Sequence, residues 1–198
     1  MQLSDFDTKF LGKNIIYYKT IDSTQKEIWR RRQNHNIKNG TIILSELQTA
    51  GMGTHGRKWY TDAKNNIAFS FLIETNCNID KIQGITVDVA ITIVEVFRKL
   101  YKIELQIKDP NDIVYQNKKM GGILTEAKIQ KEMVKCIVIG IGINTNQENF
   151  AREIERIATS IKKEFGIKVE NELVIYQFCK LFEEKLINRG IYLQNDES

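Results

Sequence analysis

Short apolar runs rich in β-branched and aromatic residues recur along this chain, and polar or glycine-containing segments separate them. Runs of this composition are typical of β-strands, and an Asn-Gly pair, here at 39–40, is typical of a turn between strands. The triplet Asn-Lys-Lys at 117–119 predicts a hairpin turn between two such runs. The predicted strands cover residues 14–19, 41–47, 67–74, 104–107, 113–115, 122–129 and 133–144.

Longer segments carry apolar residues at helical spacing. Residues 84–100 place apolar side chains around most of a helical circumference, which predicts a helix buried at the centre of the fold. Asp22 or Ser23 is a suitable N-cap for a helix that ends near Arg32. Two further helices are predicted, at 150–165 and 172–189. Together these elements predict an α+β fold, in which helices pack against a mixed, largely antiparallel sheet.

The composition is that of a soluble protein with one hydrophobic core. With 198 residues, 42% of them apolar, the chain is long enough to bury one core, and we expect a single domain over residues 1–198. The net charge of +4 is mild, and no block of like charges indicates a nucleic-acid-binding arm. The three separated cysteines indicate neither a metal site nor a disulfide framework. No signal peptide or transmembrane run occurs, so we expect a cytoplasmic protein.

A glycine-rich segment, Q-T-A-G-M-G-T-H-G-R-K-W-Y at 48–60, joins two of the predicted strands. Glycine reaches φ > 0 and lets a ligand approach the backbone, so such a loop can direct several N–H groups at an anion. The spacing of Gly51, Gly53 and Gly56 also matches the G-x-G-x-x-G of dinucleotide-binding folds, but the following residues lack the apolar stripe of a helix. A plain glycine-rich hairpin loop is the competing interpretation.

Four more motifs accompany this loop: I-D-S-T-Q at 21–25, K-D-P-N-D-I at 108–113, K-K-M-G-G-I-L-T-E at 118–126 and I-G-I-G-I-N at 139–144. In this order and at these separations the five motifs, which lie within about residues 14–146, resemble the catalytic domain of biotin–protein ligases. The resemblance implies the biotin–lipoate ligase fold, which is similar to that of class II aminoacyl-tRNA synthetases. It also implies an adenylate-forming ligase.

The activity that this resemblance implies has two steps. Biotin and ATP form biotinyl-5′-adenylate and pyrophosphate, with Mg²⁺ as cofactor, and the biotinyl group then passes to a lysine of the biotin carboxyl carrier protein domain of a carboxylase. Lys119 matches the family's catalytic lysine, whose ammonium can bridge biotin's carboxylate and the α-phosphate. Arg57 is the second expected catalytic residue. Without the neighbouring motifs, Lys119 would be interpreted as a solvated turn lysine.

By the same resemblance, hydroxyl and amide side chains near the start of the first helix hold biotin's ureido ring, because every polar group of a buried ring needs a partner. Helix capping is an alternative role for Ser23 and Thr24, and the two roles are compatible. Gln25 stands where the family has asparagine. The expected biotin-binding residues are Ser23, Thr24, Gln25, Gln48, Met52, Gly53, Thr54, Lys119 and Gly122.

The glycine-rich segment and the K-D-P-N-D-I motif are expected to hold the nucleotide, with Trp59 anchoring the far end of the loop in the core. Gly140 and Gly142 match the adenine and ribose side in the family. Asp112 is the expected Mg²⁺-linked carboxylate, although Asn and Asp near a proline also commonly form turns. The expected ATP-binding residues are Gly51, Gly53, Gly56, Arg57, Lys108, Asn111, Asp112 and Asn144.

Besides Gln25, four positions depart from the family's pattern, and one of them is His55, which stands where another cation is common. Met52 and Thr54 stand where many members have arginines, and Asp109 stands where tryptophan is usual. Each lost arginine removes a charge-assisted contact, so we expect a looser hold on the adenylate and leakage of it to bystander lysines.

Two other functions fit these motifs. A lipoate or octanoate ligase shares the fold, but the R-K-W after the glycines and the P-N-D element argue against it. A non-catalytic biotin- or nucleotide-binding module is the alternative from another class, and the departures above favour it. About 14 residues precede the first predicted strand, and no strand-rich tail follows the last motif, so we expect neither a DNA-binding helix-turn-helix domain nor an SH3-like domain. A neighbouring subunit in a homodimer could compensate for the latter.

Overall fold

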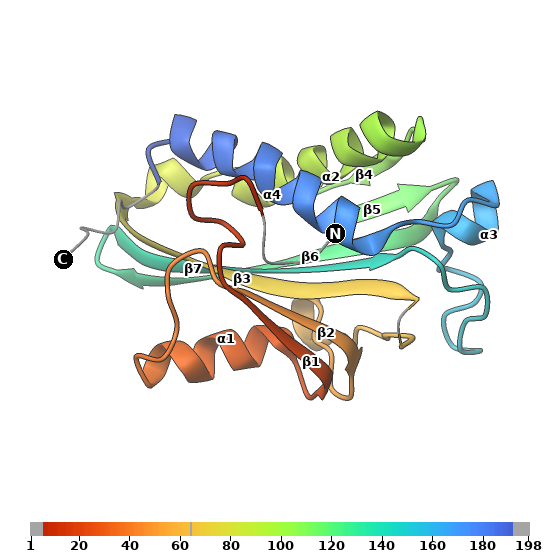
Figure 1. Cartoon of the computed structure of the whole chain (residues 1–198), viewed down its shortest axis with the longest axis horizontal. Coiled ribbons are helices and arrows are strands. Elements are labelled where there is room, and N and C mark those ends of the chain that lie inside the picture. Colours follow the sequence, from red (N-terminus) through yellow and green to blue (C-terminus); the bar gives the residue numbers. More distant parts are fainter. Residues whose placement is uncertain (1–5, 64, 192–198) are drawn as a thin grey trace.

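A computed structural model describes residues 6–63 and 65–191, and a mixed β-sheet of seven strands lies at its centre (Figure 1). The strands are β1 (Ile15–Ile21), β2 (Ile42–Gln48), β3 (Asn66–Asn78), β4 (Gln106–Lys108), β5 (Asp112–Tyr115), β6 (Lys118–Gln130) and β7 (Met133–Asn144). They lie in the order β1-β2-β3-β7-β6-β5-β4, and all neighbours are antiparallel except β1 and β2. The predicted α+β fold with a largely antiparallel sheet is confirmed.

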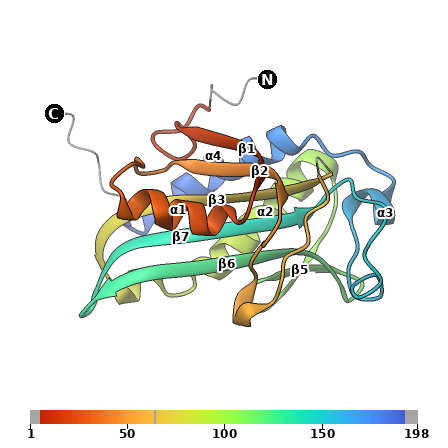
Figure 2. The same cartoon turned by 90° about the horizontal axis from the view of Figure 1, so that it is seen from below.

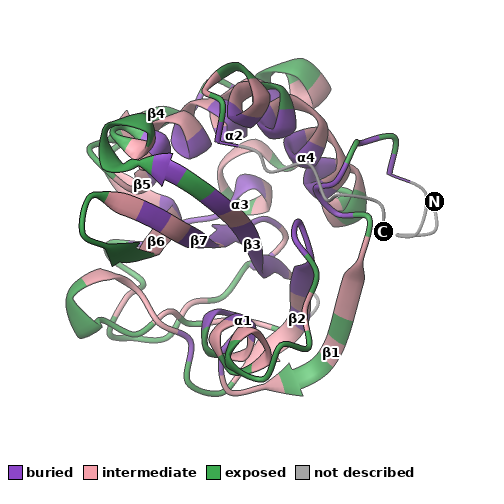
Figure 3. Cartoon of the chain, turned by 90° about the vertical axis from the view of Figure 1, so that its left-hand side faces the viewer, coloured by how far each residue is buried: buried purple, intermediate pink, exposed green. Residues whose placement is uncertain are grey.

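Helices cover both faces of the sheet. On one face lies α1 (Thr24–Gln33), and on the other α2 (Ile85–Tyr101) and α4 (Asn171–Asn188) lie side by side (Figures 1 and 3). The larger hydrophobic core fills the space between the sheet and the α2–α4 pair, and a smaller core lies under α1. No helix in the described ranges combines the length and apolar content needed to span a membrane.

The side chains of β7 show how the two faces differ. Because side chains alternate along a strand, Ile139, Ile141 and Ile143 point into the larger core. Gly140 and Gly142, between them, leave the α1 face of the strand bare. This bare strip lies beyond the first turn of α1, where the loop between β2 and β3 crosses the sheet (Figure 2). The I-G-I-G-I-N motif therefore contributes to a core on one face and leaves a surface without side chains on the other.

The predicted helix at 150–165 is wrong over most of its length. Only α3 (Ile161–Phe165) is helical. Residues 152–157 form turns, and residues 157–159 then run beside β6: Lys119 N donates to Ile157 O (2.7 Å), and Thr159 N donates to Lys119 O (2.9 Å). Backbone groups used in this strand-like bridge are not available for helical hydrogen bonds, so the helix begins only after it.

The predicted helix at 84–100 exists as α2, but it is not buried on all sides. Val89 and Val96 are buried against the sheet and α4, whereas Val87 and Ile91 are only partly buried. A helix that lies on one face of a sheet keeps a side toward solvent. The prediction from apolar residues around the whole circumference therefore overestimated how much of the helix is buried.

The hairpin between β5 and β6 turns at 116–117 rather than at 117–119. Gln116 and Asn117 have φ of 47° and 64°, the left-handed conformation that two-residue hairpin turns require. Lys118 and Lys119 are therefore strand residues of β6. Both lysines pair with residues of β5, and this pairing fixes their backbone more firmly than a turn would.

Candidate functional site

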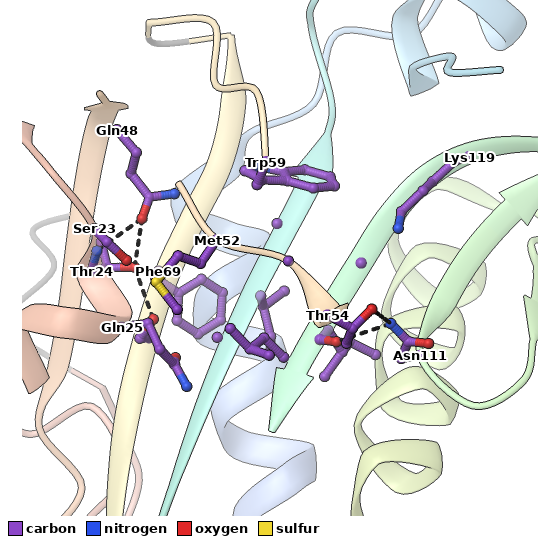
Figure 4. Close-up of a pocket in the computed structure, with 18 residues that line it drawn as sticks. Ser23, Thr24, Gln25, Gln48, Met52, Thr54, Trp59, Phe69, Asn111 and Lys119 are labelled. Atoms are coloured by element: carbon purple, nitrogen blue, oxygen red, sulfur yellow. Dashed lines mark hydrogen bonds between the residues drawn. The ribbon is translucent and has the colours of Figure 1, made fainter. Parts of the chain in front are cut away.

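A first pocket opens on the α1 face of the sheet, over the bare strip of β7. The first turn of α1 forms one wall, β6 and Asn111, directly before β5, form the other, and the glycine loop (residues 49–60) lies across the opening (Figure 4). The pocket has a cavity volume of about 40 Å³. It is lined by Ser23, Thr24, Gln25, Gln48, Met52, Gly53, Thr54, Trp59, Phe69, Ser70, Asn111, Lys119, Gly122, Ile123, Leu124, Gly140, Ile141 and Gly142.

The start of α1 presents polar groups to this pocket. Ser23 caps the helix by accepting a hydrogen bond from Lys26 N (3.4 Å), and it also lines the pocket, so capping and a binding role are compatible. Thr24 donates its backbone N–H to Gln48 Oε1 (2.8 Å), and the hydroxyls of Thr24 and Ser70 lie 2.8 Å apart. Gln48 therefore turns its amide nitrogen away from α1 (Figure 4). The helix N-terminus adds a partial positive charge.

A β-bulge in β6 directs Lys119 toward the pocket. Gly121 pairs with Ile113 of β5, and Lys119 pairs with the next residue, Val114. Met120 is consequently an extra residue in β6, and it interrupts the alternation of side chains. Met120 is fully buried in the larger core, while Lys119 lines the pocket on the opposite face.

The ammonium of Lys119 lies inside the site, under the glycine loop. Its Nζ is 2.6 Å from Asp112 Oδ1 and 5.9 Å from the centre of the Trp59 ring. A Cβ on Gly122 would lie 3.2 Å from Nζ, so glycine at that position keeps room for the ammonium. The Lys119 side chain is 32% exposed, which leaves its charge accessible to a ligand. These contacts contradict the interpretation of Lys119 as a solvated turn lysine.

Trp59 lies on the floor of the site and not in the core, which corrects the expected anchoring role. A Cβ on Gly142 would lie 2.3 Å from Trp59 Cε2, so the indole ring covers this glycine. The ring is only partly buried and belongs to neither core. Trp59 N donates to Gly51 O (3.0 Å), which closes the glycine loop on itself. The glycine loop can return across the sheet because Gly142 has no side chain and leaves room for the flat Trp59 ring.

A second cavity, of about 360 Å³, lies on the other side of Trp59. Three cations, Arg57, Lys58 and Lys119, line it together with apolar residues of the segment before α3. Cations beside an apolar surface suit a phosphate group that carries a flat ring. The residues common to both cavities are Gly53, Thr54, Trp59 and Lys119. The other lining residues of the second cavity are Tyr60, Asn144, Gln147, Ile154, Ile157 and Ala158.

Hydrogen bonds connect the P-N-D element to the glycine loop. Asn111 Nδ2 donates to Thr54 Oγ1 (3.4 Å), and Arg57 Nη2 donates to the same hydroxyl (2.9 Å). Arg57 itself is exposed. Asn144 is buried and donates to Thr159 O (3.1 Å), which connects β7 to the segment beside Lys119. Asp112 reaches the site through its ion pair with Lys119.

The structure does not bring every expected residue to a cavity. Four expected residues line neither of them: Gly51 is buried, Asp112 is connected to the site only through Lys119, and Gly56 and Lys108 are exposed. Gly56 is at the tip of the glycine loop, and Lys108 ends β4, which is the edge strand farthest from α1. Three residues expected on the nucleotide side, Asn111, Gly140 and Gly142, line the first pocket instead.

Several lining residues were not predicted. On the strands, the alternation around Ser70 would have placed it on the same face as the β7 glycines, but only if the pairing of β3 with β7 were known. The sequence of the segment before α3 did not indicate a position at the site, because this position depends on the bridge to Lys119. The unpredicted residues are Phe69, Ser70, Ile123, Leu124 and Ile141 in the first pocket and Lys58, Tyr60, Gln147, Ile154, Ile157 and Ala158 in the second cavity.

Within the described ranges, no group of three or more His, Cys, Asp or Glu side chains could hold a metal ion by itself. The three cysteines are buried free thiols. Magnesium is commonly bound by one or two carboxylates together with substrate phosphates. Asp112 fits a metal of this kind, bound largely by phosphate oxygens, and does not fit a metal site built from protein alone.

Asp22, directly before the N-cap, is held by Arg30 of the same helix. Arg30 Nη2 donates to Asp22 Oδ1 (2.7 Å) and Nη1 donates to Oδ2 (2.9 Å). These hydrogen bonds lower the pKa of Asp22 from 3.8 to about 2. The pair ties the chain that enters α1, and thereby Ser23 and Thr24, to the helix.

Comparison with known sequences shows one matching family, described as the Biotin/lipoate A/B protein ligase family, over residues 17–144. Bifunctional ligase/repressor BirA of Bacillus subtilis is 33% identical over 180 residues, which cover 90% of this chain and 55% of BirA. Bifunctional ligase/repressor BirA of Escherichia coli is 29% identical over 159 residues, covering 80% and 49%. The chain thus spans about half the length of these relatives.

Solved structures share the arrangement of the sheet and helices. Biotin protein ligase from Aquifex aeolicus in complex with biotin and ATP matches with a TM-score of 0.74 and 30% identity, over 89% of this chain and 71% of that one. Biotin protein ligase from Leishmania major in complex with biotinyl-5-AMP matches with a TM-score of 0.65 and 22% identity, over 93% and 85%. The second match concerns the fold alone.

Proposed function

Because the chain belongs to the biotin/lipoate A/B protein ligase family, we propose that it is an ATP-dependent biotin–protein ligase. It would join biotin and ATP to form biotinyl-5′-adenylate and pyrophosphate, and then transfer the biotinyl group to a lysine of a biotin carboxyl carrier protein domain. The biotin and ATP bound by the Aquifex relative support both substrates. We further propose that the protein acts in the cytoplasm, where a biotin-dependent carboxylase would be its partner, and a homodimer is compatible with this role.

One observation carries the proposal: Lys119 is among the four residues that line both cavities, and its ammonium is the one positive charge among those four. Biotin in the first pocket and the α-phosphate of ATP in the second cavity would bring two anions together. A cation between them offsets their repulsion and stabilises the negative charge that develops on phosphorus. The ion pair with Asp112 (2.6 Å) restricts where the ammonium can go, so it is oriented before the substrates arrive.

The first pocket suits biotin's ureido ring better than a lipoyl or octanoyl chain. Ser23, Thr24, Gln25, Gln48 and Ser70 all direct polar side chains to it. A ureido ring has N–H donors and a carbonyl acceptor that such groups satisfy, whereas a hydrocarbon chain would leave them unpaired. Met52 and Phe69 supply apolar surface for the rest of the substrate.

The second cavity suits the nucleotide. Arg57 and Lys58 would contact phosphate oxygens, and Gly53 lets the backbone approach them. Asn144 and the apolar segment before α3 would lie on the side of the adenine and ribose. Asp112, beside Lys119, would hold Mg²⁺ together with the phosphates, and the metal when bound would neutralise part of their charge.

The test compares substrates directly. Purified protein with MgATP should catalyse ATP–pyrophosphate exchange with biotin and much more weakly with lipoate or octanoate. Incubation with biotin, MgATP and a biotin carrier domain should then raise the mass of the carrier by one biotinyl group. Exchange with lipoate or octanoate in place of biotin would contradict the substrate, and biotin binding in calorimetry without any turnover would favour a non-catalytic module.

A further inference from the structure

Gln25 directs its amide at the floor of the first pocket, and its orientation is fixed by its neighbours. The side chain is 3% exposed. Its Nε2 donates to Glu126 Oε2 (3.0 Å) and to Val138 O (3.2 Å). An amide nitrogen carries two hydrogens, so both are used in these bonds. The carbonyl oxygen of the amide must therefore point the other way.

Gln25 Oε1 is a buried acceptor without a hydrogen-bond partner in the described structure. It lies 2.7 Å from the point that a Cβ on Gly140 would occupy, which places it on the floor of the pocket. Buried acceptors are normally paired, and one that is unpaired in a pocket is available to a ligand donor. At this position the pocket thus offers an acceptor to an N–H group and no donor to a carbonyl.

Glu126 allows only this orientation of the amide. It lies in β6 on the same face as Leu124, and its Oε2 also accepts from Trp29 Nε1 (2.7 Å). Trp29 is one helical turn after Gln25, so both donors reach the same carboxylate oxygen from α1. An ionised carboxylate only accepts hydrogen bonds, so a flipped amide would place oxygen against oxygen.

We propose that Glu126 is a positioning residue that fixes the amide of Gln25, so that Gln25 Oε1 accepts an N–H of the substrate's ureido ring. The inference deepens the proposed function and rests on it. Glu126 touches no substrate in this arrangement. It acts through Gln25, and Trp29 holds it in place from the side of α1 that faces the sheet.

The first test measures biotin affinity by calorimetry and the KM for ATP by pyrophosphate exchange. Glu126→Ala should weaken biotin binding tenfold or more, because the amide of Gln25 is then free to flip, while the KM for ATP should change less than twofold. Glu126→Gln keeps the volume and one acceptor oxygen, so it should recover most of the affinity. It also keeps the inference testable if Glu126→Ala does not fold. Glu132→Ala, an exposed position at the end of the same hairpin, should match wild type.

The second test is a double-mutant cycle. If Glu126 acts only through Gln25, the variant with both residues replaced by alanine should bind biotin no more weakly than Gln25→Ala alone. Additive losses, an unchanged affinity in folded Glu126→Ala, or an equal loss for ATP would overturn the inference. Wild-type protein that fails to bind biotin at all would contradict the proposed function itself, so the two failures are distinguishable.

Discussion

Lys119 depends on three neighbours for its position: the bulge at Met120, the carboxylate of Asp112 and the bare surface of Gly122. None of these supplies a charge that could replace it. Replacing Lys119 should therefore remove the positive charge from the site without unfolding β6. Lys118, the neighbouring lysine in β6, lines neither cavity and provides a matched control.

Lys119→Gln should lower the rate of adenylate formation about a hundredfold or more, because a neutral amide cannot offset the repulsion between two anions. The variant keeps a donor for Asp112, so the melting temperature should stay close to that of wild type. Pyrophosphate exchange with biotin gives the rate. Lys118→Ala serves as the control, since Lys118 lines neither cavity, and its exchange rate should equal that of wild type.

Thr54 lies where the two cavities meet, at a position where the resemblance predicts arginine. Its hydroxyl accepts from Arg57 (2.9 Å) and provides no charge for the adenylate. Thr54→Arg should slow the release of biotinyl-adenylate several-fold, because it adds a charge-assisted contact. Release is measured by filtering radiolabelled adenylate from the protein. If wild type releases adenylate no faster than it modifies a carrier, the expected leakage does not occur.

At the scale of elements, α1 carries the polar groups of the first pocket at its N-terminus, and the Asp22–Arg30 pair secures the chain that enters it. The pKa of Asp22 is lower in the folded protein, about 2, than its ordinary value of 3.8. A lowered pKa means that the pair stabilises the fold fully above about pH 4. The contribution is lost as the pH falls toward 2.

Asp22→Asn should therefore destabilise the protein near neutral pH by less than about 1 kcal/mol, since the pair is partly exposed. The difference in unfolding free energy between wild type and variant should stay constant above about pH 4 and shrink below it. Denaturant titrations at several pH values measure this. A difference that grew on acidification would contradict the assigned ion pair.

At the scale of the whole molecule, the glycine loop partly fills the site that it covers. The first pocket measures about 40 Å³, whereas pockets for small organic ligands usually measure about 300–1,000 Å³. Met52 and Trp59 of the loop are among the side chains that line it. A substrate the size of biotin therefore requires the loop to shift outward and then to pack on the ligand.

Hydrogen exchange tests this movement. Amides of residues 51–59 should exchange rapidly in the free protein and at least several-fold more slowly with biotin and ATP, because the ligands order the loop. Amides of β3 and β7 in the core should not change. Binding that leaves the exchange of the loop unaltered would show that the pocket opens in another way.

The sequence predicted the individual strands well and the last helix closely. The run at 133–144 coincides with β7, and Ser23, one of the two N-cap candidates, is the N-cap. Local composition and turn residues suffice for such elements because the signal lies within a few neighbouring residues. The helix expected at 150–165 failed because a bridge to β6, distant in sequence, overrode the local preference.

For the site, the sequence by itself determined which side chains could carry chemistry: the glycine loop, the lysine of β6, and the hydroxyl and amide groups at the start of α1. Only the tertiary structure decided that Trp59 covers Gly142, that a bulge turns Lys119 to the pocket, and that Glu126 orients Gln25. The physical reason is that a motif is recognised from residues that are close together in the sequence. Register, bulges and contacts between distant strands arise only when the sheet is assembled.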